Sequence, residues 1–178
     1  MPAEIVDETG REGRLEESAA RAAGEILRSI SRAACELCVL LVDDERIREL
    51  NREWRDKDAP TDVLSFPQLD APASSMAAAD TSADAAQAAV VMLGDAAQTA
   101  AVMLGDVVIS VDTLRRQAEA GGWTEEEELA RLILHGVLHL VGMDHEDPDD
   151  ARVMRAEEAR IVRVLAGRGI ACAWEDRA

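Results

Sequence analysis

Three histidines, all that the chain contains, lie within one short segment at positions 135, 139 and 145. On a helix, His135 and His139 would project from one face about one turn apart and could share a metal ion. Gly142 is placed to end that helix, so that His145 approaches from another direction. Three neutral imidazoles fill three positions of a tetrahedral zinc site and leave the fourth for water. The spacing therefore predicts one Zn²⁺ per chain, bound by His135, His139 and His145 in a hydrolytic site.

Two simpler interpretations are less favoured. A single histidine would more often satisfy a hydrogen bond in the core, but three in the pattern H-x₃-H-x₅-H around a helix-ending glycine argue against coincidence. A structural zinc usually has four protein ligands, and no cysteine lies near enough in the sequence to complete such a set. The familiar H-E-x-x-H metalloproteases carry a general-base glutamate directly after the first ligand, where this chain has Gly136. A protease of that type is therefore disfavoured.

Asp144 precedes the third histidine and has two possible roles. Its carboxylate could accept a hydrogen bond from an imidazole and so orient a metal ligand. It could equally cap the turn after the helix. The sequence leaves both roles open.

The helix that carries the first two histidines has clear end signals. Thr124 and Glu127 form a capping-box pattern at its start, and apolar residues recur at helical spacing up to Leu140. Asp147 and Pro148 then supply an N-cap and a first-turn proline for a last helix to about Ala166. The other expected elements are a helix from about Leu15 to Ala34, a strand at Cys38–Val42, a helix from Asp44 to about Trp54 capped by Asp43, a strand at Asp62–Phe66 stopped by Pro67, and a helix from about Val111 to Ala120.

A segment poor in large side chains separates two of these elements, and we expect it to be an Ala-rich, low-complexity insertion at about 70–101. The insertion contains an internal repeat. The segment AAQAAVVMLGD at 85–95 is nearly copied by AAQTAAVMLGD at 96–106. Two copies cannot build a solenoid. Only the second copy continues as an apolar run, to Ser110, so we expect that copy to supply a strand.

Strands mixed with helices over a single core indicate an α/β or α+β fold. We expect an α+β fold: one domain over residues 1–178, with a small mixed sheet of about four strands, about five helices and a zincin-like metal helix. The strand order is not predicted.

The formal charge of −17 argues against a protein that coats nucleic acid through a broad basic surface. The N-terminus has no secretory pattern, and no apolar stretch is long enough to span a membrane. An odd set of three cysteines fits a reducing compartment. We therefore expect a cytoplasmic protein with no membrane partner.

Three segments together resemble the YbeY family, the bacterial rRNA maturation factors described as single-strand-specific metallo-endoribonucleases. They are HGVLHLVGMDH at 135–145, NREWRDKDAPTDVLSFP at 51–67, and LGDVVIS at 104–110. They occur in the family's order, and the likeness runs from about residue 37 to 166. The main departure is the insertion at about 70–101, which touches none of the three segments.

The resemblance implies a metal at the end of a cleft. It also implies an endoribonuclease that acts on single-stranded RNA. The implied roles are maturation of the 3′ end of 16S rRNA and ribosome quality control. It implies that Arg55 is catalytic and engages the RNA phosphate, which a guanidinium can grip bidentately. Ribosomal or small-subunit proteins are the implied partners, and DNA is not expected. Because basic residues are few, we expect binding of free RNA to be weak and salt-sensitive.

Two other functions stay open. One is a different metallohydrolase on the same site, a peptidase or an amidase, although Gly136 counts against it. The other is a non-catalytic ribosome-assembly protein whose metal is structural. Substitution of Arg55 should leave the function of such a protein intact.

Overall fold

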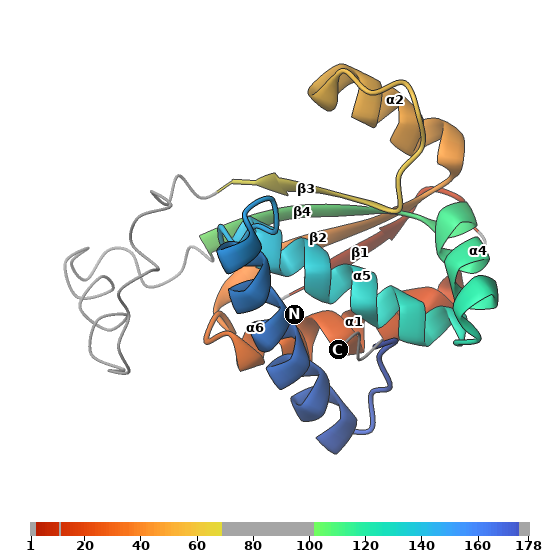
Figure 1. Ribbon diagram of the computed structural model, residues 1–178. Helices are drawn as coiled ribbons and strands as arrows, with labels where there is room; N and C mark the ends of the chain where they lie inside the picture. The colour runs from red at the N-terminus through yellow and green to blue at the C-terminus, as the bar shows by residue number, and fades with distance from the viewer. Residues whose placement is uncertain (1–2, 11, 69–101, 175–178) are drawn as a thin grey trace, which may run out of the picture.

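A computed structural model describes residues 3–10, 12–68 and 102–174 of the chain (Figure 1). A four-stranded sheet with the order β1-β2-β4-β3 forms its centre. β1 runs parallel to β2 and β2 parallel to β4, whereas the edge strand β3 is antiparallel to β4. The elements are β1 (Ala3–Asp7), α1 (Gly13–Ser29), β2 (Cys35–Val42), α2 (Asp44–Arg55), β3 (Val63–Pro67), β4 (Val102–Ser110), α4 (Val111–Gly121), α5 (Glu125–Leu140) and α6 (Pro148–Gly167).

This arrangement confirms the expected α+β fold, with four strands and five helices in the described part of the chain. The second copy of the duplicated segment does form a strand, β4, which pairs with β2 and β3. The first copy and the rest of the expected insertion lie outside the described residues. Among the helices described, none has the length and apolar character needed to cross a membrane.

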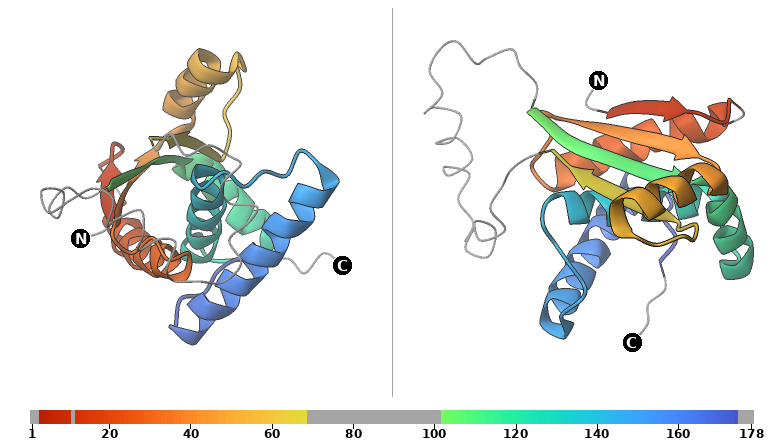
Figure 2. Two further views of the ribbon diagram at one scale, coloured as in Figure 1. Left: turned by 90° about the vertical axis from the view of Figure 1, so that its left-hand side faces the viewer. Right: turned by 90° about the horizontal axis from the view of Figure 1, so that it is seen from above.

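Helices cover both faces of the sheet (Figures 1 and 2). α1 and α5 pack on one face, where the main core includes Ile26, Val107 and Ile133. α2 lies on the opposite face over a smaller apolar cluster. α6 packs against α1 and α5 on the side away from the sheet. The helix that carries His135 and His139 is therefore held between the sheet and α6.

Most of the expected helix ends are confirmed by their caps. The Asp43 carboxylate accepts the backbone N–H of Arg46 at the start of α2. Thr124 forms the expected capping box at the start of α5, and Asp147 caps α6 ahead of Pro148. Gly142 has φ +86°, the left-handed conformation expected where the chain leaves α5.

α1 ends at Ser29, so the expected extension to Ala34 is wrong. Ser31 adopts a left-handed φ of +57°, and the backbone N–H of Arg32 bonds to the carbonyl of Leu27. This turn lets the chain reverse into β2, which begins three residues earlier than expected, at Cys35. Apolar periodicity alone did not show that β2 needs this extra length to pair with both neighbours.

Candidate metal centre

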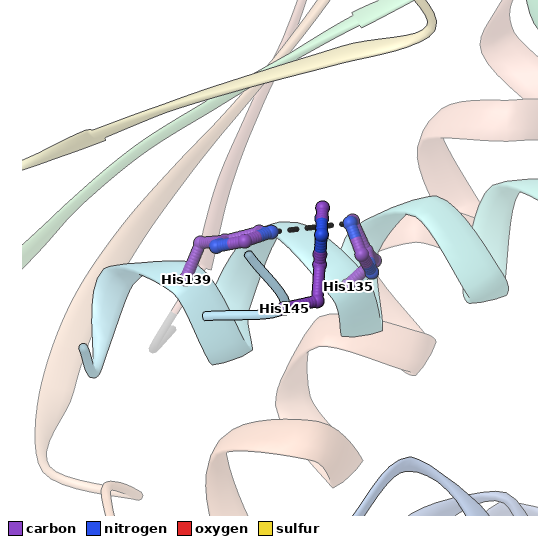
Figure 3. A group of neighbouring side chains, drawn as sticks. All are labelled: His135, His139 and His145. Carbon is purple, nitrogen blue, oxygen red and sulfur yellow. Dashed lines mark hydrogen bonds between the residues drawn. The ribbon is translucent and has the colours of Figure 1, made fainter. Parts of the chain in front are cut away.

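The three histidines meet at the C-terminal part of α5 and the turn that follows it (Figure 3). One ring nitrogen from each of His135, His139 and His145 lies within 4.8 Å of the others. The Nε2 atoms of His135 and His139 are 3.1 Å apart, and the rings of His139 and His145 have centroids 5.1 Å apart. The two helical ligands are half-buried, whereas His145 is exposed. The three residues expected to bind a metal are thus brought together with one side open to solvent.

The spacing of the donors fits one small transition-metal ion. With Zn–N bonds of about 2.0–2.1 Å, two ligands of a tetrahedral zinc lie roughly 3.3 Å apart. The 3.1 Å between His135 and His139 is close to that value. His145 lies on the short turn after Gly142, and its donor atom completes a set of three that lie within 4.8 Å of one another. Three neutral nitrogen donors with no carboxylate suit zinc better than magnesium or calcium.

Glu158, on α6, lies behind His135. The distance from His135 Nδ1 to Glu158 Oε1 is 3.0 Å, and only 16% of the Glu158 side chain is exposed. A carboxylate accepts, so this contact assigns the proton to Nδ1 and leaves the lone pair on Nε2, which lies 3.1 Å from His139 Nε2. Glu158 therefore fixes both the ring orientation and the tautomer that a metal ligand needs.

Asp144 makes a different contact. Its carboxylate accepts the backbone N–H of His145 at 2.7 Å, and this bond lowers the pKa of Asp144. No hydrogen bond joins it to an imidazole of the described chain. The geometry therefore favours the turn-capping role, and the orienting role belongs to Glu158 instead.

Gly136 faces the sheet. A Cβ atom there would lie 2.8 Å from a methyl carbon of Val107 and 3.1 Å from the hydroxyl of Ser65. The Ser65 hydroxyl donates to the Gly136 carbonyl at 3.1 Å, which ties β3 to α5 beside the histidines. A glutamate at this position would be forced into the sheet, so α5 cannot carry the general base of an H-E-x-x-H protease.

The electrostatic environment keeps His139 neutral. Burial lowers the pKa of His139, and the neighbouring His135 and His145 lower it further. A neutral imidazole keeps the lone pair that a metal requires. His139 therefore does not need to lose a proton near neutral pH before it can bind a metal.

Arg55 is the last residue of α2, the helix that lies on the sheet face opposite α5 (Figure 2). It is exposed and makes no hydrogen bond or ion pair with any residue of the described segments. Its neighbour Trp54 packs edge-on against Phe66 of β3, with ring centroids 5.8 Å apart. The edge strand β3 thus lies between Arg55 and the histidines, since its Ser65 contacts α5.

Glu158 is the residue of this centre that sequence reasoning missed. It comes thirteen residues after His145, inside a helix rich in acidic residues. One weak signal was available. Ile161 is buried in α6, and Glu157 and Glu158 precede it by four and three residues. At this helical spacing an acidic side chain lies near the buried side of the helix.

Comparison with known proteins agrees with the geometry. The profile of the family described as Endoribonuclease YbeY matches residues 5–166, which is nearly the whole chain. The chain belongs to the YbeY family. Its relatives named Endoribonuclease YbeY include one from Anaeromyxobacter dehalogenans, 44% identical over 81% of this chain and 61% of the relative. Another, from Leptospira interrogans, is 38% identical over 79% of this chain and 94% of the relative.

YbeY relatives differ in length. This chain spans 61% and 60% of the two Anaeromyxobacter relatives. The solution structure of TM1509 from Thermotoga maritima is similar with a TM-score of 0.57 and 24% identity, covering 93% of this chain and 90% of that one. This likeness concerns the fold alone, and it supports the α+β arrangement described above.

Proposed function

We propose that this YbeY-family chain is a zinc-dependent endoribonuclease specific for single-stranded RNA. Its proposed role is in maturation of the 3′ end of 16S rRNA and in ribosome quality control, in the cytoplasm. The observation that carries the proposal is the convergence of three imidazole nitrogens within 4.8 Å in a chain that belongs to a family described as endoribonucleases.

The protein's own residues have separate tasks in this proposal. His135, His139 and His145 hold the ion, and Glu158 keeps His135 in the tautomer that binds it. Bound zinc would polarise a phosphoryl oxygen or activate water. Arg55 would grip the phosphate, because its guanidinium is exposed and has no partner among the described residues. An RNA strand that crosses the edge of β3 would reach both sides of the sheet.

A peptidase or amidase on the same site is less favoured. The position next to the first ligand is Gly136, and its Cβ direction points at Val107 and Ser65 rather than at open space. No glutamate can act from there. The second alternative is an assembly protein with a structural metal. Its function would not require Arg55, whereas the proposed endoribonuclease would require it.

The charge of the chain bears on its partners. With 36 acidic and 19 basic residues, the chain carries a net negative charge that opposes the binding of RNA. We therefore propose that ribosomal or small-subunit proteins contribute affinity, and that free RNA is bound weakly and in a salt-sensitive way. Tight binding of free RNA at physiological salt would contradict this part of the proposal.

The decisive experiment measures cleavage of single-stranded RNA by metal-loaded protein, with metal content determined for each variant. We expect His139→Ala to lose both metal and activity. Arg55→Ala should keep the metal and lose activity, whereas Arg52→Ala, an exposed arginine on the same helix, should keep both. A wild-type protein that binds zinc but cuts no RNA, or an Arg55→Ala variant that cuts as well as wild type, would overturn the proposal.

A further inference from the structure

A second concave site lies next to the metal centre. A cavity of about 750 Å³ is formed by α4, α5, α6 and the segment at 173–174. Its lining includes Trp123, Arg131, Arg155, Glu158 and Trp174. Figure 1 shows α6 crossing α5, with α4 at the N-terminal end of α5. The cavity therefore extends from the region of the histidines toward the start of α5.

This cavity shares a wall with the metal centre. Glu158 lines it and also accepts the hydrogen bond from His135 Nδ1. Arg131 lies four residues before His135, on the same face of α5, which corresponds to about 6 Å along the helix axis. A chain-like substrate held at the histidines would therefore reach the cavity with its next unit.

The charges in the cavity leave one cation free. The buried Glu128 carboxylate accepts hydrogen bonds from Arg131 Nε at 2.9 and 3.0 Å, so these two charges neutralise each other. Glu158 accepts a hydrogen bond from the His135 ring and keeps its own negative charge. Arg155 is exposed and forms no hydrogen bond or ion pair with the part of the chain that the structure describes. Arg155 is therefore the guanidinium in this cavity that is available to an anion, although the Glu158 carboxylate lines the same cavity.

Two of the three tryptophans in the chain line the same cavity. The indole of Trp123 lies against Gly121, where a Cβ atom would come 1.8 Å from its Nε1 atom, so the close fit depends on the glycine. The segment before Trp174 is anchored by the Ala173 N–H, which donates to the Glu127 carbonyl at 2.9 Å. Both rings are partly buried and partly accessible. Aromatic faces beside an arginine are the usual means of binding single-stranded nucleic acid without reading its sequence.

We propose that this cavity binds one nucleotide of the single-stranded RNA, next to the phosphate held at the histidines. The base stacks on Trp123 or Trp174, and Arg155 contacts the backbone phosphate. This inference rests on the proposed function in taking RNA as the substrate. It adds a subsite beside α6 that is lined by α4, α5 and α6 and does not include Arg55 of α2.

The test is a binding titration with metal-free protein, so that no cleavage occurs. A short single-stranded RNA labelled with fluorescein is followed by anisotropy for wild type, Arg155→Ala, Trp174→Ala and Trp174→Phe. Arg163→Ala is the matched control, an exposed arginine on α6 that does not line the cavity. Circular dichroism and zinc content after reloading establish that each variant is folded.

We expect Arg155→Ala and Trp174→Ala each to weaken binding about tenfold, the loss typical of one stacked base or one phosphate contact. Trp174→Phe should retain most of the affinity, because the ring can still stack, and Arg163→Ala should change it much less. Unchanged binding in both Arg155→Ala and Trp174→Ala, or an equal loss in Arg163→Ala, would overturn the subsite. The proposed function is tested separately: if the subsite binds RNA but metal-loaded wild type does not cut it, the endoribonuclease proposal fails and the subsite remains.

Discussion

Glu158 offers the sharpest test of the metal centre, because it acts without touching the metal. Its carboxylate accepts the Nδ1–H of His135 at 3.0 Å and so presents Nε2 to the ion. In Glu158→Gln the side chain keeps its length and one acceptor oxygen but loses its charge. We expect the variant to fold and to bind zinc more weakly.

The magnitude follows from the surroundings of this hydrogen bond. Loss of the outer partner of a metal-binding histidine typically weakens metal affinity about 10- to 100-fold, or roughly 1.4 to 2.8 kcal/mol. Only 16% of the Glu158 side chain and 26% of the His135 side chain are exposed, so solvent screens the bond less than it screens a surface pair. Because glutamine can still accept a hydrogen bond, we expect about a tenfold loss in Glu158→Gln and a larger loss in Glu158→Ala.

The assay is a competition titration of zinc between the protein and a chromophoric chelator. Glu157→Gln is the matched control, since Glu157 is the adjacent residue of α6 and pairs with Arg160 rather than with an imidazole. It should bind zinc like wild type. Wild-type affinity in Glu158→Gln, or an equal loss in both variants, would refute the idea that Glu158 orients His135.

Three further predictions concern folding and pH. In Gly136→Ala the new Cβ would lie 2.8 Å from a methyl carbon of Val107, so we expect the free energy of unfolding in urea to fall by about 1–3 kcal/mol; an unchanged value would contradict the close packing of α5 on the sheet. Arg131→Met leaves the buried Glu128 carboxylate without its cation, and urea unfolding should show a loss of about 2–3 kcal/mol, since Arg131 is itself partly exposed. In metal-free protein, burial and the neighbouring imidazoles hold the pKa of His139 below its ordinary value, so the unfolded chain takes up the proton first as the pH falls below about 6.5. The free energy of unfolding should therefore decrease between about pH 7 and pH 5, and His139→Gln should reduce that dependence; an equal slope in both proteins would assign it to other groups.

The convergence of the three histidines could be predicted from the sequence because their geometry is local. His135 and His139 share a helix face, and Gly142 adopts the left-handed conformation that returns the chain toward them. Each of these relations depends on residues within about three helical turns. The caps at Asp43, Thr124 and Asp147 were predictable for the same reason.

The contacts that connect distant elements could not be predicted in this way. Glu158 meets His135 because α6 crosses α5, and the angle of that crossing is set by packing rather than by spacing. Gly105 is another example: it has φ +149°, and a Cβ atom there would lie 2.4 Å from the Phe66 carbonyl oxygen. The sequence shows this glycine within the LGD segment. The need for a glycine comes from the close pairing of β4 with β3, which is seen only in the folded sheet.

The structure also reduces the conflict between an acidic protein and an RNA substrate. Two carboxylates beside the candidate site have side-chain partners, since Glu128 pairs with Arg131 and Glu158 accepts a hydrogen bond from His135, whereas Asp144 caps the turn through the backbone N–H of His145. The three histidines would supply uncharged nitrogen donors, so a divalent ion held there would leave the centre with net positive charge beside the Glu158 carboxylate. Arg55 on α2 and Arg155 on α6 have no partner among the described residues. A phosphate chain would therefore meet local positive charge at the centre although the molecule as a whole carries −17, and recognition would depend on a few fixed contacts rather than on a basic surface.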